Sequence, residues 1–120
     1  MRTLVLAFIL GALALTSFAS AASRYCSPTG DFCTSTQRIS GAVYLRLSTF
    51  SFRGPAKVCV TEPRGIRQCR TFRLRQRGSV WQLSLRWASY FSPAGPGRYR
   101  VAFFLGPTRL GPVLDFRKHT

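Results

Sequence analysis

The chain from Gln37 onward consists of short runs in which apolar and polar residues alternate, and these runs are separated by Gly and Pro. A period of two is typical of β-strands with one buried face, whereas no helical period of useful length occurs. The predicted strands are a short piece around 33–39, 42–50, a hairpin over 57–75, 80–87, 98–105 and 109–118. About seven strands at spacings of roughly 8 to 12 residues indicate an all-β, two-sheet antiparallel sandwich.

The alternation also predicts which side chains form the core. Both tryptophans fall on apolar faces that already contain leucines, so packing is a better interpretation of them than ligand stacking. Pro112 marks an edge or a bulge in the last strand. In the strands other than the hairpin, the side chains expected to point into the core are Val43, Leu45, Leu47, Trp81, Leu83, Leu85, Trp87, Tyr99, Val101, Phe103, Leu110, Leu114 and Phe116.

The hairpin over 57–75 has a register that its own cysteines fix. If Cys59 lies opposite Cys69, Glu62 faces Ile66 and the loop is Pro63-Arg64-Gly65. Proline presets φ for a type I turn, and glycine takes the left-handed position that closes it. The disulfide is then expected outside the core. The inward residues would be Val58, Val60, Phe72 and Leu74, and the outward residues Cys59, Thr61, Cys69, Thr71, Arg73 and Arg75.

The first 21 residues have the features of a secretory signal peptide. Arg2 precedes an apolar run from Leu4 to Leu15, and Ala19-Ser20-Ala21 fits a cleavage site, with Ala22 as a neighbouring option. An uncleaved anchor is the alternative, but the run is shorter than the roughly 20 residues of a membrane span, and no later segment is long and apolar enough. We therefore expect a secreted, single-domain mature chain over 22–120.

The four cysteines indicate two disulfides in an oxidising compartment, because an even number in a short exported chain is typical of a disulfide framework. Three pairings are possible. The hairpin favours Cys59 with Cys69, and the turn-forming residues 27–31 favour Cys26 with Cys33. The C-x6-C and C-x9-C spacings do not fit zinc, and no histidine lies near them, so we expect no metal and no cofactor.

Residues Gly97-Arg98-Tyr99-Arg100-Val101 resemble the start of the sixth strand of immunoglobulin-like domains, where a Gly-x-Tyr pattern forms a tyrosine corner. The resemblance implies that Tyr99 is the corner residue and that the hairpin forms the third and fourth strands of the front sheet. The C-x9-C hairpin in a secreted chain of about 100 residues is also similar to the neocarzinostatin-type chromoprotein apoproteins. The chain is basic where those carriers are typically acidic, and its other disulfide is N-terminal, so the resemblance concerns architecture alone.

Charge is the feature that suggests a function. Without Arg2, 17 basic residues stand against three acidic residues, a formal net charge of +14. On the front sheet implied by the immunoglobulin-like order, a basic face is expected, and arginine clusters attract polyanions. Sixteen arginines, two lysines and no asparagine are also what a G- and C-rich genome gives, and a solvated strand face is the competing interpretation. The candidate ligand-binding residues are Lys57, Arg73, Arg75, Arg98, Arg100, Arg109 and Arg117.

Catalysis has little support in the sequence. His119 is the penultimate residue, where fraying is the default, so a nucleophilic serine or cysteine has no credible base. Nothing brings two of the carboxylates of Asp31, Glu62 and Asp115 together as a glycosidase requires. No glycine-rich phosphate loop and no CxxC redox pair occurs in the chain. The sequence therefore predicts a protein that is not an enzyme.

Two functions remain as hypotheses. The first is a secreted binding module that docks a polyanion: a cell-wall polymer, an acidic polysaccharide or extracellular nucleic acid. The second is a protein-interaction or inhibitor domain that presents the loops 51–56 and 91–97 to a protein partner, with Phe50, Phe52 and Phe91 as exposed anchors. Membrane disruption is less favoured because no amphipathic helix is expected.

Overall fold

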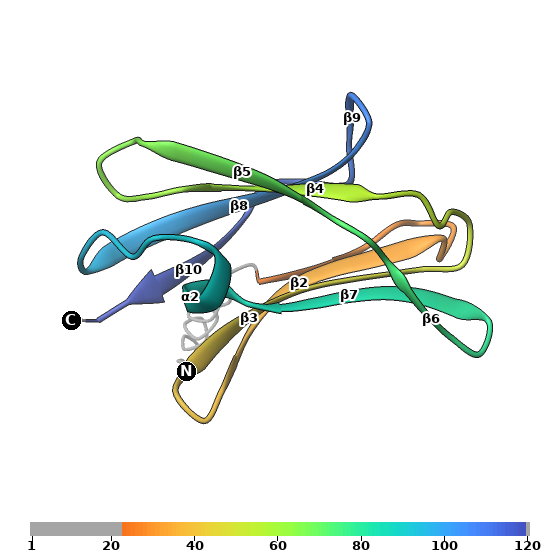
Figure 1. Cartoon of the computed structure of the whole chain (residues 1–120), viewed down its shortest axis with the longest axis horizontal. Helices are drawn as coiled ribbons and strands as arrows, with labels where there is room; N and C mark the ends of the chain where they lie inside the picture. Colours follow the sequence, from red (N-terminus) through yellow and green to blue (C-terminus); the bar gives the residue numbers. More distant parts are fainter. Residues whose placement is uncertain (1–22, 120) are drawn as a thin grey trace, which may run out of the picture.

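The computed structural model describes residues 23–119, so the predicted signal peptide lies outside the described residues. The described chain folds into two five-stranded antiparallel sheets packed face to face (Figure 1). The first sheet has the order β1-β2-β3-β7-β6, with β1 Arg24–Cys26, β2 Phe32–Ile39, β3 Ala42–Thr49, β7 Val80–Arg86 and β6 Arg75–Arg77. The second has the order β10-β8-β4-β5, with β10 Leu114–Lys118, β8 Gly97–Leu105, β4 Ala56–Thr61, β5 Arg67–Phe72, and β9 Thr108–Arg109 beside β8.

This strand order is immunoglobulin-like. The series β2-β3-β7-β6 corresponds to strands A-B-E-D of such domains, and β10-β8-β4-β5 corresponds to G-F-C-C′. The predicted two-sheet sandwich is confirmed, and the hairpin does form the third and fourth strands of its sheet. The predicted number of about seven strands was too low, because β1, β6 and β9 contain only two or three residues each. The one-turn helix α2, Trp87–Tyr90, follows β7 where a strand end was expected.

The core between the sheets consists of the side chains that the alternation assigns to it. Leu45, Tyr99, Val101 and Phe103 are completely buried, and the neighbouring polar positions on the same strands face outward. At the end of the sandwich near α2, the ring of Trp87 packs edge-on against Tyr99 and Phe116, whose own rings stack with centroids 5.1 Å apart. Both tryptophans therefore belong to the core, Trp81 as a partly buried member at its margin.

The hairpin β4–β5 has the predicted register. Cys59 lies opposite Cys69 and is bonded to it, with the two Cα atoms 4.0 Å apart. The Glu62 N–H donates to the Ile66 carbonyl at 2.9 Å, and Gly65 has φ of 104°, the left-handed value that the loop requires. The bond lies on the outer face of the sheet. Cys59 is nevertheless only 2% exposed, because β4 is a central strand and this residue lies between Cys69 and Ala102.

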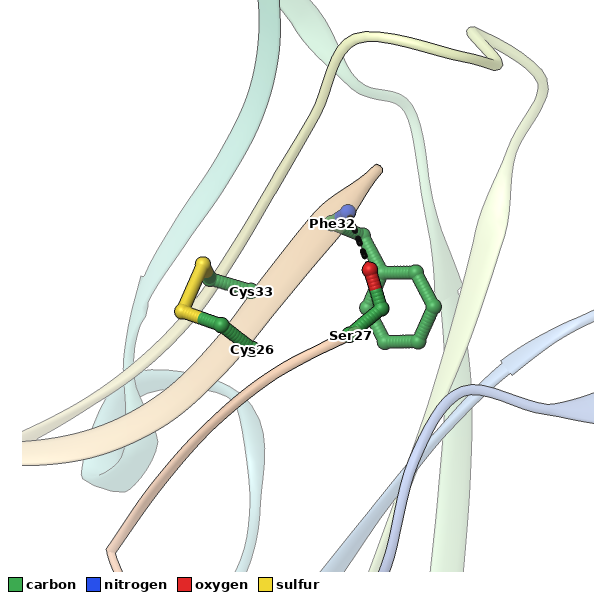
Figure 2. Close-up of a disulfide and its surroundings, with 4 residues drawn as sticks. All are labelled: Cys26, Ser27, Phe32 and Cys33. Atoms are coloured by element: carbon green, nitrogen blue, oxygen red, sulfur yellow. Dashed lines mark hydrogen bonds between the residues drawn. A yellow bond between two sulfur atoms is a disulfide. The ribbon is translucent and has the colours of Figure 1, made fainter. Parts of the chain in front are cut away.

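The N-terminal disulfide joins β1 to β2 across the predicted turn. Cys26 pairs with Cys33 as expected, and the loop between them is closed by the Ser27 N–H, which donates to the Phe32 carbonyl at 2.9 Å. The Ser27 hydroxyl oxygen accepts a hydrogen bond from the Phe32 N–H at 3.2 Å (Figure 2). Each disulfide therefore connects neighbouring strands within one sheet.

The tyrosine corner is present at the start of β8. The Tyr99 hydroxyl donates to the Gly95 carbonyl at 2.6 Å and accepts from the Ala94 N–H at 2.9 Å. Gly97 precedes it with φ of 133°, and a Cβ atom there would lie 2.8 Å from Cγ of Pro63. The Gly-x-Tyr pattern thus fixes the loop before β8 and leaves room for the tip of the β4–β5 hairpin.

One part of the hairpin prediction is wrong. The second strand was expected to continue to Arg75, but β5 ends at Phe72, and the chain then crosses to the other sheet, where Arg75 begins β6 (Figure 1). Leu74, at the crossing, is 7% exposed and belongs to the core as expected. Because Leu74 is buried between the two sheets, the alternation of inward and outward side chains continues while the chain passes from the second sheet to the first.

Candidate functional site

Five of the seven predicted ligand-binding residues lie together on the outer face of the second sheet. Alternation along β8 and β10 places Arg98, Arg100 and Arg117 there, and the register pairs Arg117 with Arg98. Lys57 on β4 is the neighbour of Phe104 on β8, and Arg109 on β9 is the neighbour of Phe104 on the other side. Exposed cations from four neighbouring strands therefore occupy one face.

Arg67 is a sixth cation on this face that the sequence analysis did not include. It lies opposite Thr61, which in turn lies opposite Arg100, so the three side chains share the outer face. The predicted hairpin register already placed Thr61 outward, so extending it by one pair would have identified Arg67. A hollow of about 510 Å³ on this face, which we call the face groove, is lined by Arg67, Arg98, Arg100, Phe104, Arg109 and Asp115, among others.

Phe104 is the aromatic residue of the face groove, which the apolar Ala102, Val113 and Leu114 also line. The side chain is half-buried, and two cations lie over its ring, with Lys57 Nζ 5.1 Å and Arg67 Cζ 5.8 Å from the centroid. Such cation–π contacts hold long basic side chains in place on an exposed sheet. The ring is therefore engaged by cations from two different strands.

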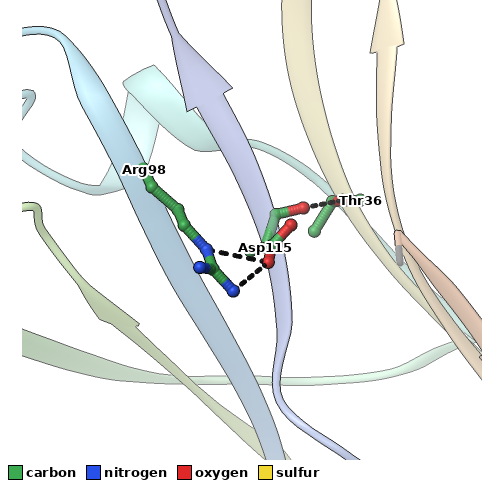
Figure 3. A network of polar contacts seen from close by, with 3 residues as sticks. All are labelled: Thr36, Arg98 and Asp115. Atoms are coloured by element: carbon green, nitrogen blue, oxygen red, sulfur yellow. Dashed lines mark hydrogen bonds and ion pairs between the residues drawn. The ribbon is translucent and has the colours of Figure 1, made fainter. Parts of the chain in front are cut away.

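Asp115 is the acidic residue of the face groove. Its carboxylate accepts from Arg98, with Nη2 2.7 Å and Nε 3.0 Å from the same oxygen (Figure 3). Its backbone carbonyl accepts from the Thr36 hydroxyl of β2 at 3.0 Å, and the Arg117 carbonyl accepts from Arg38 of β2. Arg98 is thus committed to an internal ion pair, whereas Arg100 has no carboxylate partner within residues 23–119.

The other two predicted residues, Arg73 and Arg75, are not on this face. Because the chain changes sheets after Phe72, both lie beside the first sheet, where they line a second hollow of about 740 Å³. Arg46 of β3 and Arg77 of β6 also line this hollow. We call the segment 70–77, which leads from β5 to β6, the strap, and we call the hollow the strap groove. The strap groove contains four arginines, and none of its described lining residues is acidic.

The aromatic anchors of the protein-interaction hypothesis are only partly exposed. Phe91 is 3% exposed and belongs to the core, because the turn of α2 directs it inward, where its ring lies 6.4 Å from that of Phe72. Phe52 is half-buried against Phe32, at 6.5 Å between ring centroids. Phe50 alone of the three is well exposed, at 63%. The prediction of an exposed Phe91 is therefore wrong, and the loops 51–56 and 91–97 do not form an aromatic surface.

The part of the chain that the structure describes contains no cluster of side chains suited to a metal ion. No three His, Cys, Asp or Glu side chains between residues 23 and 119 could hold a metal ion. Glu62 is buried at the hairpin tip and accepts from the Arg64 N–H, and Asp115 is paired with Arg98. All four cysteines are in disulfides.

By its fold the chain is an immunoglobulin-like β-sandwich with two cationic grooves. A comparison with models of protein families, with curated proteins and with solved structures found no match. The function is therefore inferred from the side chains of the two grooves.

Proposed function

We propose that the protein is a secreted, non-enzymatic module that binds a linear polyanion through the face groove. The observation that carries the proposal is the composition of one sheet face, with six cations and Asp115 as its acid. A solvated face without a binding role usually mixes both signs of charge. The cations are Lys57, Arg67, Arg98, Arg100, Arg109 and Arg117.

Phosphate is the anionic group that we propose, since it is one of the two, with carboxylate, that the arginine fork fits. The planar guanidinium donates two parallel hydrogen bonds to a phosphate, and four of the groove residues are arginines. Proteins that bind single-stranded nucleic acid combine such charge with aromatic rings on which bases stack. The ring of Phe104 is instead occupied by Lys57 and Arg67. These contacts favour a phosphate-bearing polymer without bases, such as an anionic cell-wall polymer.

Export of the protein agrees with this function. Two disulfides are typical of oxidising compartments, and between residues 23 and 119 no helix has the length and apolarity of a membrane span. Both features are compatible with a secreted protein.

The test is binding of the protein to inorganic polyphosphate over a range of salt concentrations. For a ligand bound by five phosphate contacts, a plot of the logarithm of the binding constant K against log[salt] has a slope of about −3.5. The affinity therefore falls by about 10²-fold between 50 and 200 mM salt. The variant Lys57→Gln, Arg67→Gln, Arg100→Gln, Arg109→Gln is expected to reduce the slope at this groove to about −1.

The matched control removes four other exposed basic side chains, Arg24→Gln, Arg53→Gln, Arg64→Gln and Arg86→Gln, and has the same net charge. We expect the control to bind more tightly than the face-groove variant at every salt concentration. Equal losses in the two variants would mean that total charge, and not the face groove, determines binding.

A further inference from the structure

The strap groove has the properties of a second polyanion site. Arg73, Arg75 and Arg77 are exposed and two residues apart, and in an extended chain this spacing is about 6.6 Å. Arg75 lies opposite Gln82 on β7, and Ser84, two residues further along β7, lies opposite Arg46. The arginines of the strap and of β3 therefore flank the same stretch of β7.

The arginines of the strap groove have no internal counter-charge. No ion pair to Arg46, Arg73, Arg75 or Arg77 occurs among residues 23–119, and the hydrogen-bond partner of Arg46 is the neutral Gln37, at 2.7 Å from Nη1 to Oε1. The face groove, by contrast, contains Asp115. Four uncompensated guanidinium groups around one hollow repel one another, and a bound polyanion relieves this repulsion.

The aromatic rings at the rim of the strap groove are already engaged. Arg70 lies over Tyr90 and Phe72, with Cζ 5.6 and 6.0 Å from the ring centroids, and its Nη1 donates to the Tyr90 carbonyl at 3.0 Å. As in the face groove, cations occupy the rings that a nucleic-acid base would use. The same ligand chemistry, a phosphate chain without bases, therefore fits both grooves.

The two grooves are separate. They share no lining residue. The strap groove lies along β3, β6 and β7 of the first sheet, with Phe72 and Tyr90 at its rim, whereas the face groove lies on the second sheet, on β4, β5, β8, β9 and β10. We propose that the strap groove binds a second phosphate-bearing polymer chain, so that one domain bridges two chains. This inference rests on the proposed function of the face groove.

A bridging assay tests the inference. Long-chain polyphosphate is immobilised, the protein is bound and the surface is washed, and fluorescently labelled polyphosphate is then added. Retained protein measures binding, and retained label measures bridging. The strap variant is Arg73→Gln, Arg75→Gln, Arg77→Gln, and its charge-matched control is Arg24→Gln, Arg64→Gln, Arg86→Gln. Thermal unfolding checks that each variant is folded, and light scattering without polymer checks that the protein is monomeric, since a dimer would also bridge.

We expect the strap variant to remain on the immobilised polymer through the face groove while it captures about tenfold less label than the control. The face-groove variant is expected to behave in the same way through the strap groove. If the strap variant captures as much label as its control, the second site is refuted and the proposed function stands. If the unmodified protein does not bind polyphosphate at all, the proposed function fails and bridging fails with it.

Three further outcomes would overturn part of the proposal. If only the strap variant loses binding to the immobilised polymer, the strap groove is the principal site and two-site bridging is refuted. Labelled single-stranded DNA and labelled heparin, matched in charge, replace the labelled polyphosphate in parallel arms. Tighter capture of DNA would overturn the choice of a polymer without bases, and tighter capture of heparin would replace phosphate by sulfate as the recognised group.

Discussion

The substitution Tyr99→Phe isolates the contribution of the tyrosine corner. The Tyr99 ring is completely buried against Trp87 and Phe116, and Phe keeps the ring and these contacts. The change removes one oxygen atom, which leaves the Ala94 N–H and the Gly95 carbonyl without their partner. The loop between α2 and β8 then loses the two hydrogen bonds that attach it to the start of β8.

The expected loss follows from these two bonds. A hydrogen bond contributes about 0.5 to 1.5 kcal/mol net, so we expect the free energy of unfolding to fall by about 2 kcal/mol. For a domain of about 100 residues, each kcal/mol corresponds to roughly 4 to 8 °C, so Tm falls by roughly 8 to 16 °C. Urea unfolding followed by tryptophan fluorescence measures the loss, because Trp87 lies against the substituted ring.

Tyr44→Phe is the control for this measurement. Tyr44 is a half-buried tyrosine on the outer side of β3, and its hydroxyl has no hydrogen-bond partner within residues 23–119. Its loss is expected to stay within about 0.5 kcal/mol, as for other surface changes. If Tyr99→Phe unfolds at the same urea concentration as Tyr44→Phe, the corner does not stabilise the fold and the reasoning from its hydrogen bonds is refuted.

Two further substitutions test the hairpin tip and the face groove. Gly97→Ala places a Cβ 2.8 Å from Pro63 at a φ of 133°, so it should lower the free energy of unfolding, measured in urea, by about 1 to 3 kcal/mol. The control is Gly106→Ala, which has a positive φ but no atom within 4 Å of the added Cβ, and it should lower this free energy less. Equal losses in the two variants would exclude the contact with Pro63 as the cause. Asp115→Asn releases Arg98 and removes the acid from the face groove, so affinity for polyphosphate should rise about 3- to 10-fold in the binding assay. An unchanged affinity would show that Arg98 and Asp115 lie outside the ligand's path.

The register of the hairpin was predictable because three independent patterns agree on it. When Cys59 is placed opposite Cys69, the hairpin has a loop of three residues, and those residues have the turn chemistry that such a loop needs. The alternation of apolar and polar residues in the two strands also agrees with this register. The inward residues of β3, β7 and β8 were predictable for the same reason, since one buried face imposes a period of two.

The change of sheet after Phe72 was not predictable from alternation. The period of two distinguishes inside from outside, but both sheets face the same core, so Leu74 satisfies the pattern whichever sheet the chain joins. The seven candidate residues therefore do not share one face: five lie on the outer face of the second sheet, and Arg73 and Arg75 lie beside the first sheet. Phe91 was misplaced for a related reason, because the turn residues around it are typical of an exposed loop while the helical turn before it points its ring inward.

Both disulfides close within a hairpin, at sequence separations of 7 and 10 residues. In antibody domains the conserved bond instead joins one layer to the other. Correct pairing of the cysteines in this chain requires only that two adjacent strands meet, since short loops close at low entropic cost, and it does not require an assembled sandwich. The nascent chain can thus be oxidised correctly while its layers are still apart, and apart from the connecting segments of the chain those layers are held together by noncovalent packing.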